Sequence, residues 1–483
     1  MLLRSFRTHY LRHISTYIAI TLSCYFLAQT SKQMHNAFYI LALLPTLLIL
    51  DRQLLQRLFS STIFKVLLAF GVWHTASISW SESPNIDNAK DVLYVVLFVI
   101  AVAIAWQNRD NRHRHTQIIA SLITCLPSLY LLFTSDHSLR LSGGPGIFSN
   151  PITAANSLIF LIIANVYLAC TVKRKEHILI YVLAALLHFY VFTLCQSRGS
   201  LAALLAGTAV LVCFRFAKAR QLKIFAACSI IAASLIATYA IHKNWLAIPA
   251  AGPQKITYHV PKELNITSVQ VNQIVSNHAQ GQGILALQSG SMTSKSNKVK
   301  LNQQTRNITI TLATPTFKPY TQFEVIGQSE DGRNVPLSTS PPRILDFDTT
   351  FGNRLDIWIG FYKTIKQKPL IGHGASHQQS VMTDSRKTPY YDPHNVLVGT
   401  ALSSGGIGLF MHLLLLIITL KELMKQSPAR PLFLSLFAAG MISTMLDDPS
   451  FFDSPLPYWL LILIPMGYAM SSQVQSILPR KTS

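Results

Sequence analysis

Charged residues are scarce in this chain of 483 residues. Asp, Glu, Lys and Arg together make up 13% of it, which is about half the share found in an ordinary soluble domain. Hydrophobic residues make up 50%. The low charge and high apolar content argue against a typical soluble protein and indicate a membrane protein.

Cysteine is missing from the longest polar part of the chain. All six cysteines lie in or beside apolar stretches, and the segment 243–394 has none. This distribution implies neither a disulfide framework nor a metal site built on cysteine. The first apolar stretch also lacks a small-x-small cleavage pattern after it, so we interpret it as a membrane span and not as a signal peptide.

Apolar stretches that approach the roughly twenty residues needed to cross a bilayer recur along the chain. We predict an all-α polytopic membrane protein with about twelve transmembrane helices. The expected spans are 14–30, 36–50, 63–80, 91–106, 117–134, 151–170, 177–195, 200–214, 224–242, 395–420, 431–446 and 457–472.

The basic residues are distributed unevenly between the loops. Acidic residues number 20 against 41 Lys and Arg, a formal net charge of +21. Every second loop, counted with both termini, carries two to four Lys or Arg residues. The other short loops carry only Lys32, Lys90, Arg140 and Arg198. This asymmetry predicts that the N- and C-termini are cytoplasmic, and it explains the positive charge without a nucleic-acid partner.

The segment 243–394, between the ninth and tenth expected spans, has a different texture. Within it, residues 253–345 contain alternating apolar positions such as Ile308, Ile310 and Leu312, separated by Gly, Asn and Ser. This period of two is typical of strands. We therefore divide the chain into helices one to nine (1–242), a large non-cytoplasmic loop with a β-rich insert (243–394), and helices ten to twelve with a cytoplasmic tail (395–483).

Helical periodicity returns after the insert. Apolar residues at 355, 358, 359, 362 and 365 share one face of an expected helix over 353–368. Asn353 is expected to cap its start and Pro369 to end it. We interpret the helix as amphipathic and interfacial, lying in the outer leaflet boundary, with packing against the β-rich insert as the alternative.

Three motifs are expected at the non-cytoplasmic face. The first is Gln196-Ser197-Arg198-Gly199-Ser200, between two apolar spans. An arginine there costs several kcal/mol unless it reaches the interface or finds a partner. Arg198 therefore suggests an anionic ligand or a buried ion pair, and a snorkelling loop arginine is the plainer alternative.

The second motif is Tyr390-Tyr391-Asp392-Pro393-His394-Asn395, directly before the tenth span and followed by the small-residue run 403–408. Histidine suits proton transfer near neutral pH, and Asp392 or Asn395 is positioned in sequence to orient its ring. By itself, one loop histidine among the sixteen in the chain is more often unremarkable than catalytic.

The third motif is Phe351-Gly352-Asn353-Arg354 with the downstream Pro369-Leu370-Ile371-Gly372-His373-Gly374. Arg354 at a helix N-terminus would add its charge to the positive end of the dipole and favour phosphate there; a structural arginine is the alternative. Arg140 is a further candidate, and the acidic residues of the last outer loop are weaker ones: Asp447, Asp448 and Asp453.

The chain resembles the superfamily of O-antigen ligases and O-antigen polymerases, bacterial membrane enzymes that use glycans linked to undecaprenyl diphosphate. The resemblance covers nearly the whole chain except the β-rich insert. It depends on the helix count with a large loop after the ninth span, on the three motifs above, and on their order. Many members have a shorter and more helical loop, so the insert leaves the acceptor open.

The resemblance implies a glycosyltransferase of the inner membrane that acts on the periplasmic side, with inversion and without a metal or other cofactor. It implies His394 as general base and Arg198 and Arg354 as catalytic groups that hold the diphosphate. We add Arg140, Asn395 and Tyr391 as substrate-binding candidates. The implied partners are membrane lipids, an undecaprenyl-diphosphate-linked glycan donor and a lipid A-core acceptor.

Several alternatives remain open at this point. A polymerase of the same superfamily would use a second lipid-linked glycan as acceptor, and a protein O-oligosaccharyltransferase would use a periplasmic protein. A transporter of lipid-linked sugars is the non-enzymatic alternative. Transporters commonly place ionisable residues near the bilayer midplane, whereas the arginines and histidine singled out here are expected at one face.

Overall fold

A computed structural model describes the chain in two compact units, one formed by residues 1–237 and 343–483 and the other by residues 238–342. The described residues of the first unit are 2–107, 113–134, 141, 144–215, 347–375, 381–383, 386–390, 392–425, 427–447 and 450–474. In the second unit, only seven strands between residues 254 and 337 are described. We describe each unit separately.

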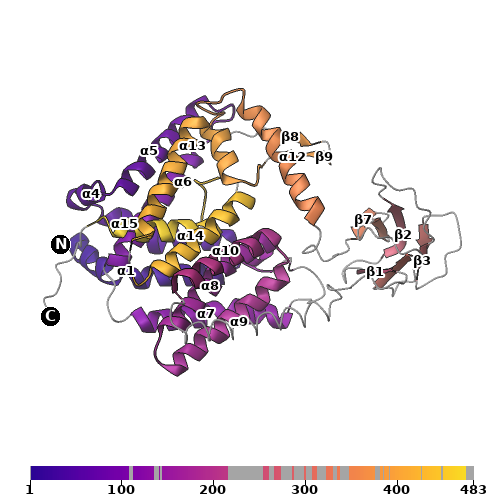
Figure 1. Cartoon of the computed structure of the whole chain (residues 1–483), viewed down its shortest axis with the longest axis horizontal. Coiled ribbons are helices and arrows are strands. Elements are labelled where there is room, and N and C mark those ends of the chain that lie inside the picture. The colour runs from indigo at the N-terminus through magenta and orange to yellow at the C-terminus, as the bar shows by residue number, and fades with distance from the viewer. Residues whose placement is uncertain are drawn as a thin grey trace. The chain divides into compact units, whose positions relative to one another are not determined.

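The first unit is a bundle of helices (Figure 1). Its N-terminal half contains α1 (Leu2–Leu27), α2 (Ser31–Phe38), the π-helical segment η1 (Tyr39–Leu43), α3 (Leu44–Ile49), α4 (Arg52–Leu58), α5 (Thr62–Ser77), η2 (Ile78–Trp80), α6 (Asp87–Gln107), α7 (His113–Thr134), η3 (Gly146–Ser149), α8 (Pro151–Thr171), α9 (Lys175–Cys195) and α10 (Arg198–Arg215). Its C-terminal half contains α12 (Phe347–Ile365), the paired strands β8 (Val381–Thr383) and β9 (Arg386–Tyr390), α13 (Val396–Leu423), α14 (Arg430–Leu446), the π-helical segment η5 (Trp459–Leu463) and α15 (Ile464–Ser471).

Six helical segments are long and apolar enough to cross a membrane: 62–80, 87–107, 116–134, 151–171, 175–195 and 396–423. A seventh is possible if the pair 32–49 and 52–58, bent by 101°, forms one span. These segments lie in the described part of the chain, and the expected ninth span, 224–242, lies outside it. The chain is thus a helical membrane protein, and a total of twelve spans stays a prediction.

Helix α6 lies at the centre of the bundle. Its residues from Val95 to Ala105 are all buried, which fits a sequence that is apolar on every side. Aromatic side chains pack beside it, since the ring of Phe98 lies 4.7 Å from that of Trp459. This core joins the N-terminal helices to the last ones, so segments far apart in sequence form one body.

Helix α12 begins earlier than the sequence motif suggested. It starts at Phe347, so the expectation that Asn353 caps it and that Arg354 lies at its N-terminus is wrong. Asp346 and Asp348, which bracket the true start, are the usual signal for such a start. Arg354 therefore projects from the middle of a helix, where the dipole contributes little to its environment.

The apolar face of α12 packs on α13. Ile357 and Phe361 are buried against Leu402, with Trp358 and Ile365 partly buried beside them. The expected apolar face is thereby divided: Trp358 and Ile365 face the protein, whereas Ile359 and Tyr362 are exposed. The helix ends at Ile365, four residues before Pro369.

The second unit contains two antiparallel sheets. Their strands are β1 (Gln254–His259), β2 (Ile266–Gln273), β3 (Leu285–Leu287), β4 (Lys298–Lys300), β5 (Asn307–Leu312), β6 (Phe323–Ser329) and β7 (Asn334–Leu337). The strand orders are β1-β5-β3 and β4-β2-β6-β7. In the first sheet Ile256 and Tyr258 stand opposite Ile310 and Ile308, so the apolar positions of neighbouring strands are in register.

Candidate functional site

Arg198 begins α10 at a sharp corner with α9. The preceding Gln196 has a positive φ of 48°, a conformation that costs energy for residues other than glycine. The Ser200 hydroxyl donates to the Asn156 side chain of α8 at 2.6 Å and lies 2.8 Å from the Ser197 hydroxyl. These buried hydrogen bonds fix the corner against α8, and with it the position of Arg198.

Gly199 is required at this corner because a carboxylate lies against it. A Cβ atom at this position would stand 2.8 Å from Oδ2 of Asp447 and 3.4 Å from Leu446. Asp447 directly follows the C-terminal end of α14. The glycine after Arg198 thus allows the first turn of α10, with its positive dipole end, to approach a buried acidic group.

Arg354 reaches the same carboxylate from α12. Its Nη2 lies 2.7 Å from Oδ1 of Asp447, and its Nη1 donates to the Leu446 carbonyl. The Arg354 side chain is 19% exposed and that of Asp447 only 5%. The first turn of α10, the end of α14 and the middle of α12 therefore meet at Asp447. Sequence reasoning had placed this residue among several weak acidic candidates.

His394 shares the unusual backbone of Gln196. Its φ is 49°, and among the described residues these two are the non-glycine positions with positive φ. The backbone N–H of His394 donates to Oδ1 of Asp392 at 2.7 Å, and this bond holds the turn. Strained positions of this kind cluster at functional sites, and here one lies at the expected base and the other two residues before Arg198.

The imidazole of His394 is accessible and has an acidic neighbour. Its side chain is 43% exposed, and its Nδ1 lies 3.8 Å from Oδ1 of Asp392. This separation is too long for a hydrogen bond, but it is short enough for Asp392 to stabilise a positive charge on the ring. Asn395 instead caps α13, since its side-chain oxygen accepts from the N–H groups of Leu397 and Val398.

Helix α12 connects the arginine with the histidine. Arg354 and Trp358 are four residues apart, so they share one side of the helix at a rise of about 6 Å. The Trp358 indole donates to the Pro393 carbonyl at 3.0 Å, directly before His394. One helix thus contacts both Asp447 and the turn that carries the candidate base.

The segment 369–374 has a structural role beside the site. Its backbone bonds to a break in α13: His373 N–H donates to Leu402, and Gly406 N–H donates to Pro369, each at 2.8 Å. Gly405, at the break, has a φ of 67°. The backbone N–H groups of Gly372, His373 and Gly374 bond to Lys368 and to α13, so this segment supports the break in α13.

Asp453 is a second acidic group, and it interacts with Asp392. Burial, reinforced by the negative charge of Asp392, raises its pKa, although the backbone N–H and hydroxyl of Ser454 partly offset the shift. The carboxylates of Asp453 and Asp392 are therefore close enough to influence each other. This links the loop before η5 to the turn that carries His394.

The structure brings together some of the expected site residues. Arg354 bonds to Asp447, and Gly199, which follows Arg198, packs against the same carboxylate. His394 and Asn395 directly precede α13, and Trp358, one helical turn after Arg354 on α12, donates to the adjoining Pro393. Arg140 and Tyr391 lie outside the described residues. Within the described part of the chain, no group of three or more His, Cys, Asp or Glu side chains has the arrangement of a metal site.

The fold and the cluster define a helical membrane protein with arginine and histidine side chains held at one end of its helices. Residues 183–413 match the family model described as O-antigen ligase, which spans all three motifs. The chain is also 27% identical over 124 residues to an O-antigen ligase of Pseudomonas aeruginosa; that match covers 25% of this chain and 31% of the relative.

The resemblance to the O-antigen ligase family is thereby confirmed for the matched region. The aligned part spans less than a third of the Pseudomonas relative.

Proposed function

We propose that this protein is an O-antigen ligase that transfers a glycan from undecaprenyl diphosphate to a hydroxyl group of a lipid A-core sugar. The observation that carries the proposal is the double contact of α12, through Arg354 to Asp447 beside Gly199 and through Trp358 to the turn of His394. A base and two guanidinium groups held by one scaffold are what displacement of a diphosphate from a sugar needs.

His394 is the proposed general base. It accepts the proton of the acceptor hydroxyl while that oxygen attacks the anomeric carbon, and the bond from this carbon to the diphosphate oxygen breaks. The electron pair leaves with undecaprenyl diphosphate. A single displacement of this kind inverts the anomeric centre. Asp392, 3.8 Å from Nδ1, stabilises the charge that the ring acquires.

Arg354 and Arg198 are the proposed diphosphate ligands. An arginine has five N–H donors, and Arg354 uses two in its contacts with Leu446 and Asp447 among the described residues. The remaining donors are suited to phosphate oxygens. Arg198 begins α10, whose N-terminal dipole adds to the attraction for an anion. Asp447 holds Arg354 in place before the donor arrives.

We further propose that the site faces the periplasm and that both termini lie in the cytoplasm. The basic loops on the opposite side support this orientation, as does the number of expected spans, twelve, with the ninth at 224–242. The exposed Ile359 and Tyr362 of α12 fit a position in the outer interface, with Lys366 over the Tyr362 ring at 4.8 Å. The protein then resides in the bacterial inner membrane.

The β-rich insert, residues 253–345, is proposed to recognise the acceptor. Its two antiparallel sheets offer a surface that the transmembrane helices do not supply. Substitutions there are expected to change the use of the lipid A-core acceptor more than the binding of the donor. An equal loss of both would contradict this assignment.

The direct test is transfer by the purified protein in detergent. The substrates are a lipid-diphosphate glycan and lipid A-core, with and without EDTA, and the comparison is wild type, His394→Ala and Arg354→Ala. We expect transfer by the wild type that persists in EDTA, and losses of about 10²- to 10⁴-fold in the variants. An anomeric product of inverted configuration is expected by NMR.

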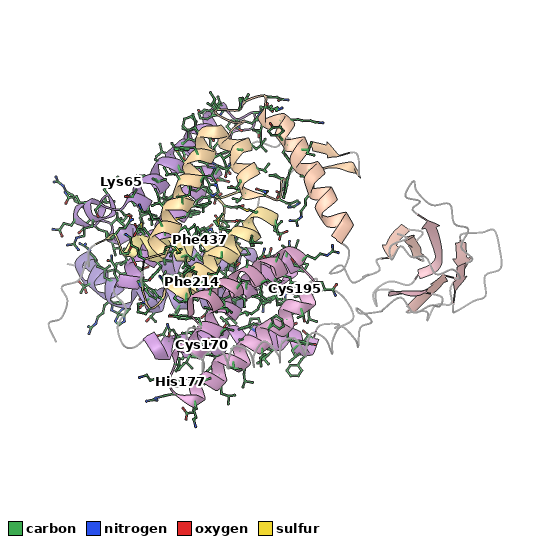
Figure 2. All side chains as sticks on the ribbon, in the orientation of Figure 1. Lys65, Cys170, His177, Cys195, Phe214 and Phe437 are labelled. Atoms are coloured by element: carbon green, nitrogen blue, oxygen red, sulfur yellow. The ribbon has the colours of Figure 1, made fainter. Side chains whose placement is uncertain are left out.

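His177→Ala is the matched control. His177 lies at the start of α9 and Cys195 at its end (Figure 2), a separation of about 27 Å along the helix axis. The control is expected to retain activity. Full activity of His394→Ala would refute the base assignment. Lengthening of the lipid-linked donor without use of lipid A-core would replace the ligase by a polymerase.

A further inference from the structure

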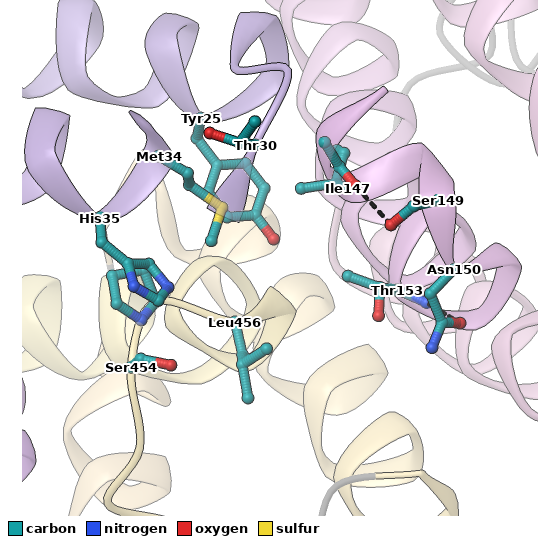
Figure 3. Close-up of a pocket in the computed structure, with 12 residues that line it drawn as sticks. Tyr25, Thr30, Met34, His35, Ile147, Ser149, Asn150, Thr153, Ser454 and Leu456 are labelled. Carbon is teal, nitrogen blue, oxygen red and sulfur yellow. Dashed lines mark hydrogen bonds between the residues drawn. The ribbon is translucent and has the colours of Figure 1, made fainter. Parts of the chain in front are cut away.

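A cavity of about 220 Å³ lies beside the candidate site and is not used by the proposed roles of His394 and the arginines. It is a partly open pocket lined by residues of α1 and α2, of η3 and the start of α8, and of the loop before η5 (Figure 3). Side chains from these three parts of the chain surround one space in the close-up. Residues of the first unit alone line it.

The lining favours a neutral polar ligand. None of the twelve lining residues is Lys, Arg, Asp or Glu, and His35 is the one basic side chain, so a phosphate group would find no guanidinium or ammonium partner there. Six of the residues carry hydroxyl or amide side chains: Tyr25, Thr30, Ser149, Asn150, Thr153 and Ser454. An acyl or prenyl chain would deprive these groups of water without replacing its hydrogen bonds.

Several of these polar groups retain hydrogen-bonding capacity. The Thr30 hydroxyl accepts from the Gln33 N–H, and its own hydrogen remains to be donated. The Asn150 oxygen accepts from two backbone N–H groups of α8, so its NH₂ group is the part available to a ligand. Among the described residues, the Thr153 hydroxyl has no hydrogen-bond partner. The pocket therefore offers both hydrogen-bond donors and hydrogen-bond acceptors to a ligand.

The rest of the lining is apolar. Met34, Ile147 and Leu456 line the same space as the polar groups. Tyr25, also in the lining, is fully buried and its hydroxyl bonds to Ser157 at 2.9 Å, so it supports the wall of the pocket. A surface that is apolar on one side and rich in hydroxyls on the other matches a pyranose, whose ring has C–H faces and a hydroxyl edge.

The size of the pocket suits a ligand of about one ring. A cavity of about 150 Å³ accepts benzene, so a space of about 220 Å³ accommodates a six-membered ring with its hydroxyl groups. Water molecules in the pocket would be released when a sugar binds.

The cavity is connected to the corner that carries Arg198 and to the turn that carries His394. Thr153 lies one helical turn before Asn156, which holds the Ser200 hydroxyl beside Arg198 at 2.6 Å. On the other side, Ser454 bonds to Asp453, whose carboxylate is close enough to Asp392 to feel its charge. A sugar here would be part of a glycan that extends from the place where the bond forms.

We propose that the cavity between α2, α8 and the loop before η5 binds one neutral pyranose unit of a substrate glycan. This inference rests on the proposed function, because the donor and the acceptor both supply such units. Sugars of the donor and of the acceptor present the same ring faces and hydroxyl groups. Experiment decides which of the two substrates occupies the cavity.

The test measures saccharide binding to the full-length protein in lipid nanodiscs by saturation-transfer difference NMR. The probes are the free oligosaccharide released from the lipid-linked donor, the free oligosaccharide of lipid A-core, and undecaprenyl phosphate without sugar. The variants are Thr153→Trp, which fills the cavity, and Thr153→Val, which removes one hydroxyl with almost no change in shape. Thr134→Val, at the exposed end of α7, is the control.

We expect one oligosaccharide to bind the wild type, and to bind Thr153→Val about tenfold more weakly. Thr153→Trp should show no detectable binding. Thr134→Val should bind as the wild type does. Competition between the two oligosaccharides identifies the donor or the acceptor as the source. Unchanged binding in both Thr153 variants, or displacement of the saccharide by undecaprenyl phosphate, would overturn the inference.

The binding test separates this inference from the proposed function. The wild type could bind the oligosaccharide, with the expected loss in the Thr153 variants, and yet transfer no glycan. That result would support the sugar site and contradict the ligase function. A wild type that transfers glycan while Thr153→Trp binds and transfers normally would keep the ligase and reject the sugar site.

Discussion

Arg354 of α12 and Asp447 at the end of α14 form an ion pair with Nη2 and Oδ1 at 2.7 Å, and the Asp447 side chain is 5% exposed. The second oxygen of Asp447, Oδ2, is buried and has no hydrogen-bond partner among the described residues. The pair joins the middle of α12 to the end of α14, and the first turn of α10 packs against it at Gly199.

Asp447→Ala is expected to lower the free energy of unfolding by about 3–5 kcal/mol, because it leaves the Arg354 charge partly buried without its partner. Asp447→Asn should cost less, since its side-chain oxygen still accepts from Arg354. Denaturant unfolding in detergent measures both. Lys425→Ala breaks the more exposed pair with Glu422 and should cost at most about 1 kcal/mol. Equal costs at the two pairs would contradict this account.

Gly199→Ala should destabilise the protein by about 1–3 kcal/mol, because the new Cβ would meet Oδ2 of Asp447 at 2.8 Å. A double-mutant cycle tests the cause. In the background of Asp447→Ala the same change should cost less, and the coupling energy should exceed about 0.5 kcal/mol. Additive effects would show that the carboxylate is not what excludes a side chain from position 199.

Gly405→Ala is expected to be severe, with a loss of about 3 kcal/mol or more. The φ of Gly405 is 67°, and its Cβ would stand 2.3 Å from the Leu370 carbonyl oxygen. The neighbouring Gly406→Ala is the matched control, because its nearest contact is the Pro369 oxygen at 3.2 Å. Thermal unfolding of the two variants should differ clearly, and similar midpoints would show that the break in α13 tolerates a side chain.

His394→Gly should separate stability from transfer. Glycine adopts the φ of 49° without strain, while it increases the freedom of the unfolded chain, so the free energy of unfolding is expected to change by less than about 1 kcal/mol. Glycan transfer should fall by about 10²- to 10⁴-fold through loss of the base. A large loss of stability would instead assign the ring a structural role.

Asp453→Asn is expected to make stability less dependent on pH. The raised pKa of Asp453 means that the folded protein keeps a proton that the unfolded chain releases above its ordinary pKa of 3.8. The stability of the wild type therefore falls as pH rises from that value through the folded pKa. Asn cannot ionise, so unfolding midpoints of the variant should decline less from pH 4 upward. Glu82→Gln, which removes one exposed carboxylate, is the control.

The sequence by itself determined the membrane class, most helix positions and the family resemblance. These depend on local composition, since a run of apolar residues must leave water wherever it lies, and the motifs around Arg198, Arg354 and His394 are short and contiguous. The sequence pattern also placed α13 correctly to within a few residues, at Val396–Leu423.

The tertiary structure alone decided what these residues contact. Arg354 lies in the middle of α12 and not at its start. The apolar face of that helix is divided between α13 and the exterior. Segment 369–374 forms backbone hydrogen bonds with the break in α13. The tertiary structure also selected Asp447 from the acidic residues of its loop. Such contacts join positions about 30 to 250 residues apart, and local periodicity carries no information about pairs at that separation.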